Sequence, residues 1–281
     1  MRSTARIAGV GLHTGASVSV ALHPATVDSG VVFISQRIAI PARLESVVDT
    51  ARATTLGSDG ATVRTVEHLL SALAGMGVDN TRIEVDGPEL PALDGSAKEW
   101  VALIDSAGLE TQGAPTRLVV VDDRVHVTDG GARLEAAPAD AFAARYEIMY
   151  PGTPVGHMTA DFEAAADAYA AAIAPARTFG LSEEVEALRA AGLARGGSLD
   201  NALVIYPDRY SSPLRLPAEP ARHKILDLIG DLSLLGARLQ ARISVVRGGH
   251  RTHLRLAQAI QHQARSRAHT QPRTGVGTHG H

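Results

Sequence analysis

The 281-residue chain contains no cysteine, and only two of its 27 basic residues, Lys98 and Lys224, are lysines. Without cysteine there is no disulfide and no thiolate ligand, so any metal ion must be held by His, Asp or Glu. The scarcity of lysine draws attention to Lys224, because an ammonium is a compact donor that arginine does not replace. The chain also lacks an 18-residue apolar run, which excludes a predicted membrane span.

Strong charge of either sign is also missing. The net charge is −3 and 45% of residues are hydrophobic, values typical of a soluble globular protein. This balance gives no reason to expect nucleic acid or an anionic membrane as a partner. The N-terminal residues are not followed by the apolar segment of a signal peptide. We therefore expect a cytoplasmic protein, and we expect a monomer.

Strand and helix patterns occur twice along the chain. Residues 1–112 contain several strand patterns and two helix patterns with a strand between them, and residues 113–264 repeat this order. Such an order favours an α+β fold over a parallel doubly wound sheet. We predict two similar two-layer α/β sandwich domains with the active site between them. Residues 265–281 lack periodicity and are predicted to form a flexible tail.

A G-x-G pattern at residues 9–11 invites a dinucleotide-binding interpretation. That motif requires a helix after the glycines, whereas an alternating strand pattern follows here, so we reject it. His13 lies in the same turn. A ligand contact for His13 is a weaker hypothesis than an ordinary turn position.

The segment 222–236 has the clearest chemical pattern. Its many leucines and isoleucines predict a largely buried helix, yet His223, Asp227 and Asp231 recur at i, i+4 and i+8 and share one face. Buried charges are costly unless they are paired or bind a metal. A His and an Asp one turn apart can both reach one cation. The alternative, in which both aspartates pair with arginines elsewhere, is equally compatible with this segment alone.

A third ligand is expected from the predicted helix at 65–75, which carries Glu67 and His68. An isolated Glu-His pair is more often an exposed carboxylate beside a core histidine. Combined with His223 and Asp227, however, His68 completes two imidazoles and one carboxylate with a position left for water. This composition is typical of catalytic zinc, and non-haem iron oxygenases use the same set. Glu67 could accept a proton beside the metal.

Several separate segments resemble one enzyme family, the UDP-3-O-acyl-N-acetylglucosamine deacetylases, which are zinc amidases of lipid A biosynthesis. The resemblance begins at G-V-G-L-H-T-G and continues in order to about residue 260. It is carried by T-V-E-H-L-x-S-A-L-x-G-x-G-V-D-N at 65–80, D-G-S-A at 94–97, A-R-T-F-G at 176–180, G-G-S-L-D at 196–200, R-H-K-I-L-D-L-I-G-D-L at 222–232 and G-G-H at 248–250.

The resemblance implies a role for each matching residue. It implies Zn²⁺ on the three ligands proposed above, with Glu67 as general base and His250 as general acid. Asp231 would orient the His250 imidazolium. The residues of the Gly-Gly-His turn alone would not have indicated an acid.

The resemblance also implies substrate contacts. Lys224 and the Thr178 hydroxyl would lie near the reacting acetamide, and Phe179 would contact the sugar. Arg247 stands where the family usually has a lysine near the nucleotide diphosphate. Leu181 stands where some members carry a second aromatic residue, and it begins an insert, about 181–206, expected to form the acyl passage.

The substrate implied by the resemblance is UDP-3-O-acyl-N-acetylglucosamine, and the reaction is hydrolysis of its acetamide. Thr55 stands where some members carry a cysteine, which bears on inhibitor fit and not on the reaction class. Two other hypotheses stay open at this point. One is an Fe(II) oxygenase, and the other is a catalytically inactive protein that binds sugar nucleotides.

Overall fold

A five-stranded sheet forms the base of the first half, with the strand order β1-β2-β8-β3-β4. The structure is a computed structural model, and it describes residues 1–164 and 166–270. Strand β3 is parallel to β8, and all other neighbours are antiparallel. Buried and exposed residues alternate along β8, as expected when only one face of the sheet is covered. The strands are β1 (Ala5–Val10), β2 (Ser17–Pro24), β3 (Val31–Ser35), β4 (Ile38–Pro41) and β8 (Thr81–Asp86).

The second half contains a sheet of the same design, with the order β10-β11-β17-β12-β13. Here too, one inner pair, β12 and β17, is parallel and the others are antiparallel. The strands are β10 (Val125–Asp129), β11 (Ala132–Ala137), β12 (Ala143–Tyr150), β13 (Gly156–Glu163) and β17 (Arg242–Val246).

The helices complete the repeat. In each half, four strands are followed by a helix, the fifth strand and a last helix, so α1 corresponds to α5 and α2 to α6. The prediction of two similar α+β halves is therefore confirmed. The helices are α1 (Glu67–Gly75), α2 (Lys98–Ala107), α3 (Ala166–Ala172), α4 (Ser182–Ala190), α5 (Glu219–Ser233) and α6 (His250–Thr270).

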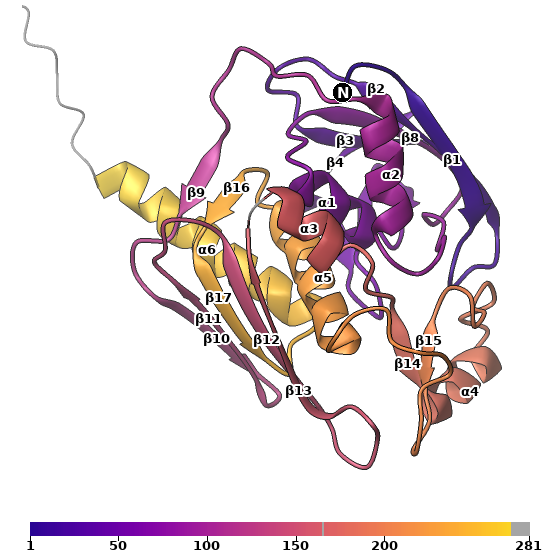
Figure 1. Ribbon diagram of the computed structural model, residues 1–281. Helices are drawn as coiled ribbons and strands as arrows, with labels where there is room; N and C mark the ends of the chain where they lie inside the picture. The colour runs from indigo at the N-terminus through magenta and orange to yellow at the C-terminus, as the bar shows by residue number, and fades with distance from the viewer. Residues whose placement is uncertain (165, 271–281) are drawn as a thin grey trace, which may run out of the picture.

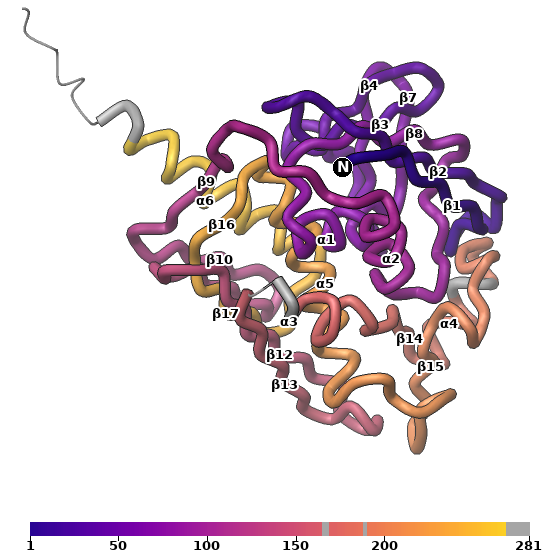
Figure 2. Tube along the Cα trace, turned by 45° about the horizontal axis from the view of Figure 1, so that its top comes forward, coloured from indigo at the N-terminus to yellow at the C-terminus, as the bar shows by residue number. Residues whose placement is uncertain are grey.

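Helices α1 and α5 lie side by side between the two sheets, as both views show (Figure 1, Figure 2). Helix α2 packs on the first sheet, and α5 and α6 pack on the second. One continuous apolar core runs through both halves. The first turns of α1 and the middle of α5 are therefore buried where the halves meet.

Several short elements complete the two halves. The strands among them have only three or four residues, and those at 47–49, 55–58, 61–63 and 179–181 lay outside the strand patterns of the sequence, because so few residues show little two-residue period. The first half has a small sheet of β5 (Val47–Asp49), β6 (Thr55–Ser58) and β7 (Ala61–Val63) before α1. The second half has β14 (Phe179–Leu181), α4 and β15 (Leu203–Ile205) at the corresponding place before α5 (Figure 1). Strands β9 (Leu118–Val120) and β16 (Arg238–Gln240) pair in parallel, and Leu44–Ser46 form a 3-10 turn.

Helix α6 continues to Thr270, six residues beyond the end predicted from the sequence. The remainder of the predicted tail, 271–281, lies outside the described residues. Within the described part of the chain, none of the helices has the length and apolar character needed to cross a bilayer.

Candidate metal centre

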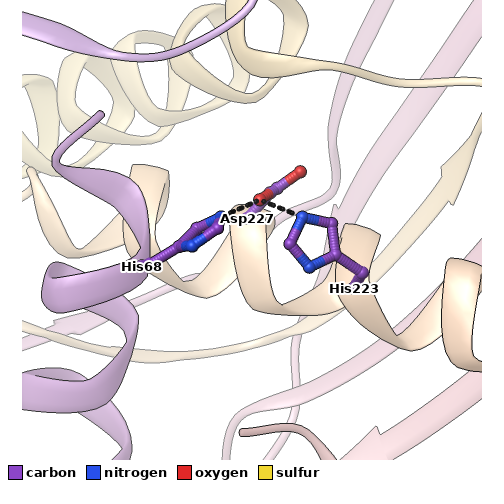
Figure 3. Close-up of side chains that lie close together, drawn as sticks. All are labelled: His68, His223 and Asp227. Atoms are coloured by element: carbon purple, nitrogen blue, oxygen red, sulfur yellow. Dashed lines mark ion pairs between the residues drawn. The ribbon is translucent and has the colours of Figure 1, made fainter. Parts of the chain in front are cut away.

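Three side chains from the two central helices converge where the halves meet. His68 comes from the first turn of α1, and His223 and Asp227 come from successive turns of α5 (Figure 3). Asp227 Oδ1 lies 3.7 Å from His68 Nε2 and 3.3 Å from His223 Nε2. The two imidazole rings meet edge to face with centroids 5.0 Å apart. The three ligand atoms thus face one point.

A glycine permits this convergence. A Cβ atom on Gly230 of α5 would lie 2.1 Å from the backbone oxygen of Glu67, so no other residue fits without moving the helices apart. The close approach of α1 and α5 brings His68 to the face of α5 that carries its own two ligands. The i, i+4 spacing of His223 and Asp227 places both of these side chains on that face.

The three side chains fit a divalent metal ion by their chemistry. His223 Nδ1 donates to the Ala176 carbonyl at 3.0 Å, which leaves Nε2 free as the ligand atom. Burial lowers the pKa of both imidazoles, that of His68 to about 3. Both imidazoles are therefore unprotonated. Burial by itself raises the pKa of Asp227, but Lys224 and the imidazoles outweigh it and hold that pKa well below its usual value.

A second group of ionisable residues flanks these ligands. His250 Nε2 lies 3.9 Å from Glu67 Oε1, while His250 Nδ1 donates to Asp231 Oδ2 at 2.8 Å. Thr54 connects the two carboxylates, since its backbone N–H donates to Glu67 Oε2 at 3.1 Å and its hydroxyl donates to Asp231 Oδ1 at 2.6 Å. Glu67 and His250 are thereby held facing each other beside the three ligands.

The surroundings shift the pKa values of this pair in a useful way. Burial, aided by the charges of Asp227 and Asp231, raises the pKa of Glu67 to about 7. Burial by itself lowers the pKa of His250, but the Asp231 carboxylate outweighs it and raises that pKa to about 9. A carboxylate therefore coexists with an imidazolium in the neutral to mildly alkaline range, and this combination is suited to general base and general acid catalysis.

Two residues near this group were missed in the sequence. His253 Nδ1 also lies 2.8 Å from Asp231 Oδ2, and its Nε2 lies 2.9 Å from the Tyr146 hydroxyl. The H-x-x-H spacing of His250 and His253 places both on one side of α6 and was the available signal. Tyr146 on β12 had no such signal, because only the fold brings its hydroxyl to His253 of α6.

The loop before β14 is fixed against α5 by a buried ion pair. Arg177 Nε and Nη2 donate to Glu219 at 2.8 and 3.0 Å, and the Arg177 guanidinium also binds Ser212 and Pro213. Next to it, Thr178 is half-buried, and its backbone N–H donates to Gly95 at 2.7 Å.

The residues predicted to bind substrate differ in how closely they approach the three candidate ligands. The Phe179 ring lies edge-on to His223, with centroids 6.2 Å apart. Lys224 Nζ donates to Asp227 Oδ2 at 2.7 Å, so its ammonium contacts a predicted ligand directly. Leu181 is half-buried on β14. Arg247 is exposed, and its guanidinium lies over the turn at Gly131 between β10 and β11.

His13 and Thr55 were weaker candidates in the sequence, and both are buried. The backbone N–H of His13 donates to the buried Glu89 carboxylate at 3.0 Å. Among the described residues, His13 Nδ1 and the Thr55 hydroxyl have no hydrogen-bond partner. Neither residue contributes a ligand atom to the three-residue group described above.

Comparison with known proteins identifies the family of this chain. A family model described as UDP-3-O-acyl N-acetylglycosamine deacetylase matches residues 1–262. Proteins named UDP-3-O-acyl-N-acetylglucosamine deacetylase are similar along most of their length. The one from Myxococcus xanthus is 44% identical over 91% of this chain and 83% of its own. Those from Thermosynechococcus vestitus and Nostoc sp. are 43% and 45% identical, over 94% and 90% of this chain and 93% and 94% of their own. The chain belongs to the UDP-3-O-acyl-N-acetylglucosamine deacetylase family.

Proposed function

We propose that this protein is a zinc-dependent hydrolase that removes the N-acetyl group from UDP-3-O-acyl-N-acetylglucosamine and releases acetate, a step of lipid A biosynthesis. One observation carries the proposal beyond family membership. Two unprotonated imidazoles and a carboxylate converge beside a facing carboxylate and imidazole, Glu67 and His250, 3.9 Å apart. Amide hydrolysis needs both a base and an acid at such a centre.

His68, His223 and Asp227 would hold the metal ion. Two nitrogen donors and one oxygen donor suit zinc with an open coordination position, and the hydrogen bond from His223 to Ala176 supports its ligand orientation. Bound there, zinc would lower the pKa of a water molecule to about 7 and polarise the amide carbonyl. An iron oxygenase could use the same donors, but it would leave Glu67 and His250 without a task.

The proton transfers are assigned to the facing pair. Glu67 accepts a proton from the attacking water molecule while the oxygen of that water bonds to the acetyl carbon. His250 donates its Nε2 proton to the sugar nitrogen as the C–N bond breaks, so the products are acetate and a free amine. Asp231 stabilises the imidazolium and holds its Nδ1–H, which directs Nε2 toward the reaction.

The remaining predicted residues are assigned to the substrate. The Thr178 hydroxyl, with Lys224, is proposed to stabilise the negative charge that develops on the acetyl oxygen. Phe179 is proposed to contact the sugar and Arg247 the diphosphate. Leu181 and the insert at 181–206 are proposed to receive the acyl chain. The cytoplasmic location and the monomeric state stay predictions.

Acetate release from the acylated UDP-sugar, measured together with metal content, tests the proposal. We expect a chelator to abolish the reaction and about one equivalent of Zn²⁺ to restore it. UDP-N-acetylglucosamine without the acyl chain is the control, and it should react far more slowly. Oxygen consumption with Fe²⁺, or full activity in the chelated protein, would refute the assignment.

A further inference from the structure

Asp231 has more partners than the orientation of one imidazole requires. Its Oδ2 accepts hydrogen bonds from His250 Nδ1 and His253 Nδ1, both at 2.8 Å, while Oδ1 accepts one from the Thr54 hydroxyl. His253 is fully buried on α6 and has its own partner, the Tyr146 hydroxyl on β12. Helices α5 and α6 and the loop of Thr54 thus meet at one carboxylate, and β12 is connected to it through His253.

We propose that Tyr146 and His253 act as a positioning pair that fixes the Asp231 carboxylate against the His250 imidazole. This inference rests on the proposed role of His250 as the acid. In this arrangement neither Tyr146 nor His253 contacts the reacting atoms. Their effect is transmitted through Asp231.

The hydrogen-bond pattern defines one protonation state for the pair. An ionised carboxylate only accepts hydrogen bonds, so His253 must carry its proton on Nδ1. Burial lowers the pKa of His253, which leaves a neutral ring with a bare Nε2. Nε2 then accepts from the Tyr146 hydroxyl, whose own pKa burial raises, so the phenol keeps its proton. The Tyr146 hydroxyl thus donates to His253 Nε2, and the His253 Nδ1–H donates to Asp231 Oδ2.

The packing around the pair is equally close. A Cβ atom on Gly248 would lie 2.9 Å from the Tyr146 hydroxyl and 3.3 Å from His253 Nε2, so a glycine is needed beside their hydrogen bond. The tyrosine and histidine rings are perpendicular, with centroids 5.7 Å apart. Both rings are thereby restrained, which limits the directions from which His253 can reach Asp231.

A metal ion is the competing explanation, because Asp231, His250 and His253 also form a compact group of possible ligands. The two imidazoles approach the same carboxylate oxygen through Nδ1 at 2.8 Å, however, and that is the distance of a charge-assisted hydrogen bond. The other nitrogen of His253 already binds Tyr146. Hydrogen bonds account for all of these contacts.

The test compares His253→Leu, His253→Asn and Tyr146→Phe in the zinc-loaded enzyme. Leucine removes the donor to Asp231, and we expect kcat to fall about 10-fold, with KM and zinc content unchanged. The alkaline limb of the pH profile should move upward, because Asp231 then interacts with His250 alone. Asparagine can still donate through its amide and should largely restore kcat. Tyr146→Phe should lower kcat by a smaller factor.

The pH measurement concerns His250, which is also faced by Glu67 on α1 and by Asp227 on α5. His157→Leu is the matched control, since His157 also pairs with a carboxylate, Glu147, but on the exposed face of the second sheet. It should leave kcat and the pH profile unchanged. If His253→Leu lowers only the melting temperature, with kcat and the alkaline limb unaltered, the pair is structural and the inference fails.

Imidazole NMR of the zinc-loaded protein provides a readout independent of activity. We expect His253 to be protonated on Nδ1 and bare on Nε2, and Tyr146→Phe to shift the Nε2 resonance. The opposite tautomer, or a second zinc that is lost in His253→Leu, would overturn the inference. If the wild-type protein releases no acetate, the proposed function fails, and the NMR result alone then decides whether the pair holds Asp231. The NMR also decides the matter if His253→Leu does not fold.

Discussion

Replacing Asp231 with asparagine should disable the enzyme mainly by removing the proton from His250. The structure raises the pKa of that imidazole from 6.5 to about 9, against the effect of burial, because the Asp231 carboxylate lies 2.8 Å away. A shift of this size corresponds to roughly 3 kcal/mol of preference for the charged ring. Asparagine has a similar shape but no charge, so most of this preference should disappear.

The direction of the pH effect follows from the role of the acid. In the proposed mechanism protonated His250 is the active acid, so the acid is present below the folded pKa of about 9 and is lost as pH rises through it. In Asp231→Asn the loss should begin near or below pH 6.5. At pH 8 the protonated fraction falls from about 90% to about 3%, which predicts roughly a 30-fold lower kcat from this cause alone.

The assay is the pH dependence of kcat for acetate release by the zinc-loaded variant. Zinc content and melting temperature show whether the fold is retained. Asp161→Asn is the matched control, because Asp161 is an exposed aspartate paired with Arg145, and its loss should leave the profile unchanged. An alkaline limb that stays near pH 9 in Asp231→Asn would refute the reasoning, since His250 would then not depend on this carboxylate.

Three further substitutions test other parts of the centre. Glu67→Gln should keep zinc but lower kcat at least 100-fold, measured as acetate release beside metal analysis, because the amide cannot accept the proton; undiminished turnover would exclude Glu67 as the base. His223→Ala should lose zinc itself, and metal retention after dialysis would contradict its role as a ligand. Gly230→Ala should lower the free energy of unfolding by about 1–3 kcal/mol and weaken zinc binding, because its Cβ would displace the Glu67 backbone; unchanged denaturation and zinc titrations would contradict the close-approach argument.

The helices that carry the three proposed ligands could be predicted from local pattern. Helix α5 is long and apolar, and the spacing of His223 and Asp227 along it fixes their common face before any tertiary structure is known. The doubling of the fold was visible for the same reason, since strand and helix periods repeat in order. That His68 joins the other two ligands was only a hypothesis from the sequence, because no local rule brings together helices about 150 residues apart.

The supporting contacts could not be predicted. The hydrogen bond from Thr54 to Asp231 connects residues 177 positions apart, and the threonine lies in a loop without periodicity. Tyr146 has the pattern of an ordinary strand residue, and only the fold brings its hydroxyl to His253 of α6. His250 itself was assigned as an acid only through the family resemblance. Its raised pKa depends on burial and on a carboxylate from another helix, and neither is encoded in the Gly-Gly-His turn.

The position of the centre follows from the repeat. Helices α1 and α5 occupy equivalent places in the two halves, and each contributes proposed ligands from the face that meets the other. The first half supplies one proposed ligand and the proposed base, while the second supplies two proposed ligands and the proposed acid, so neither half holds the complete set. The inserts before α1 and before α5 also occupy equivalent places, and Thr54 of the first insert donates hydrogen bonds to Glu67 and to Asp231, the carboxylate that binds His250. Chemistry at this centre therefore requires that the two halves pack together, and the absence of a side chain at Gly230 is what allows them to do so.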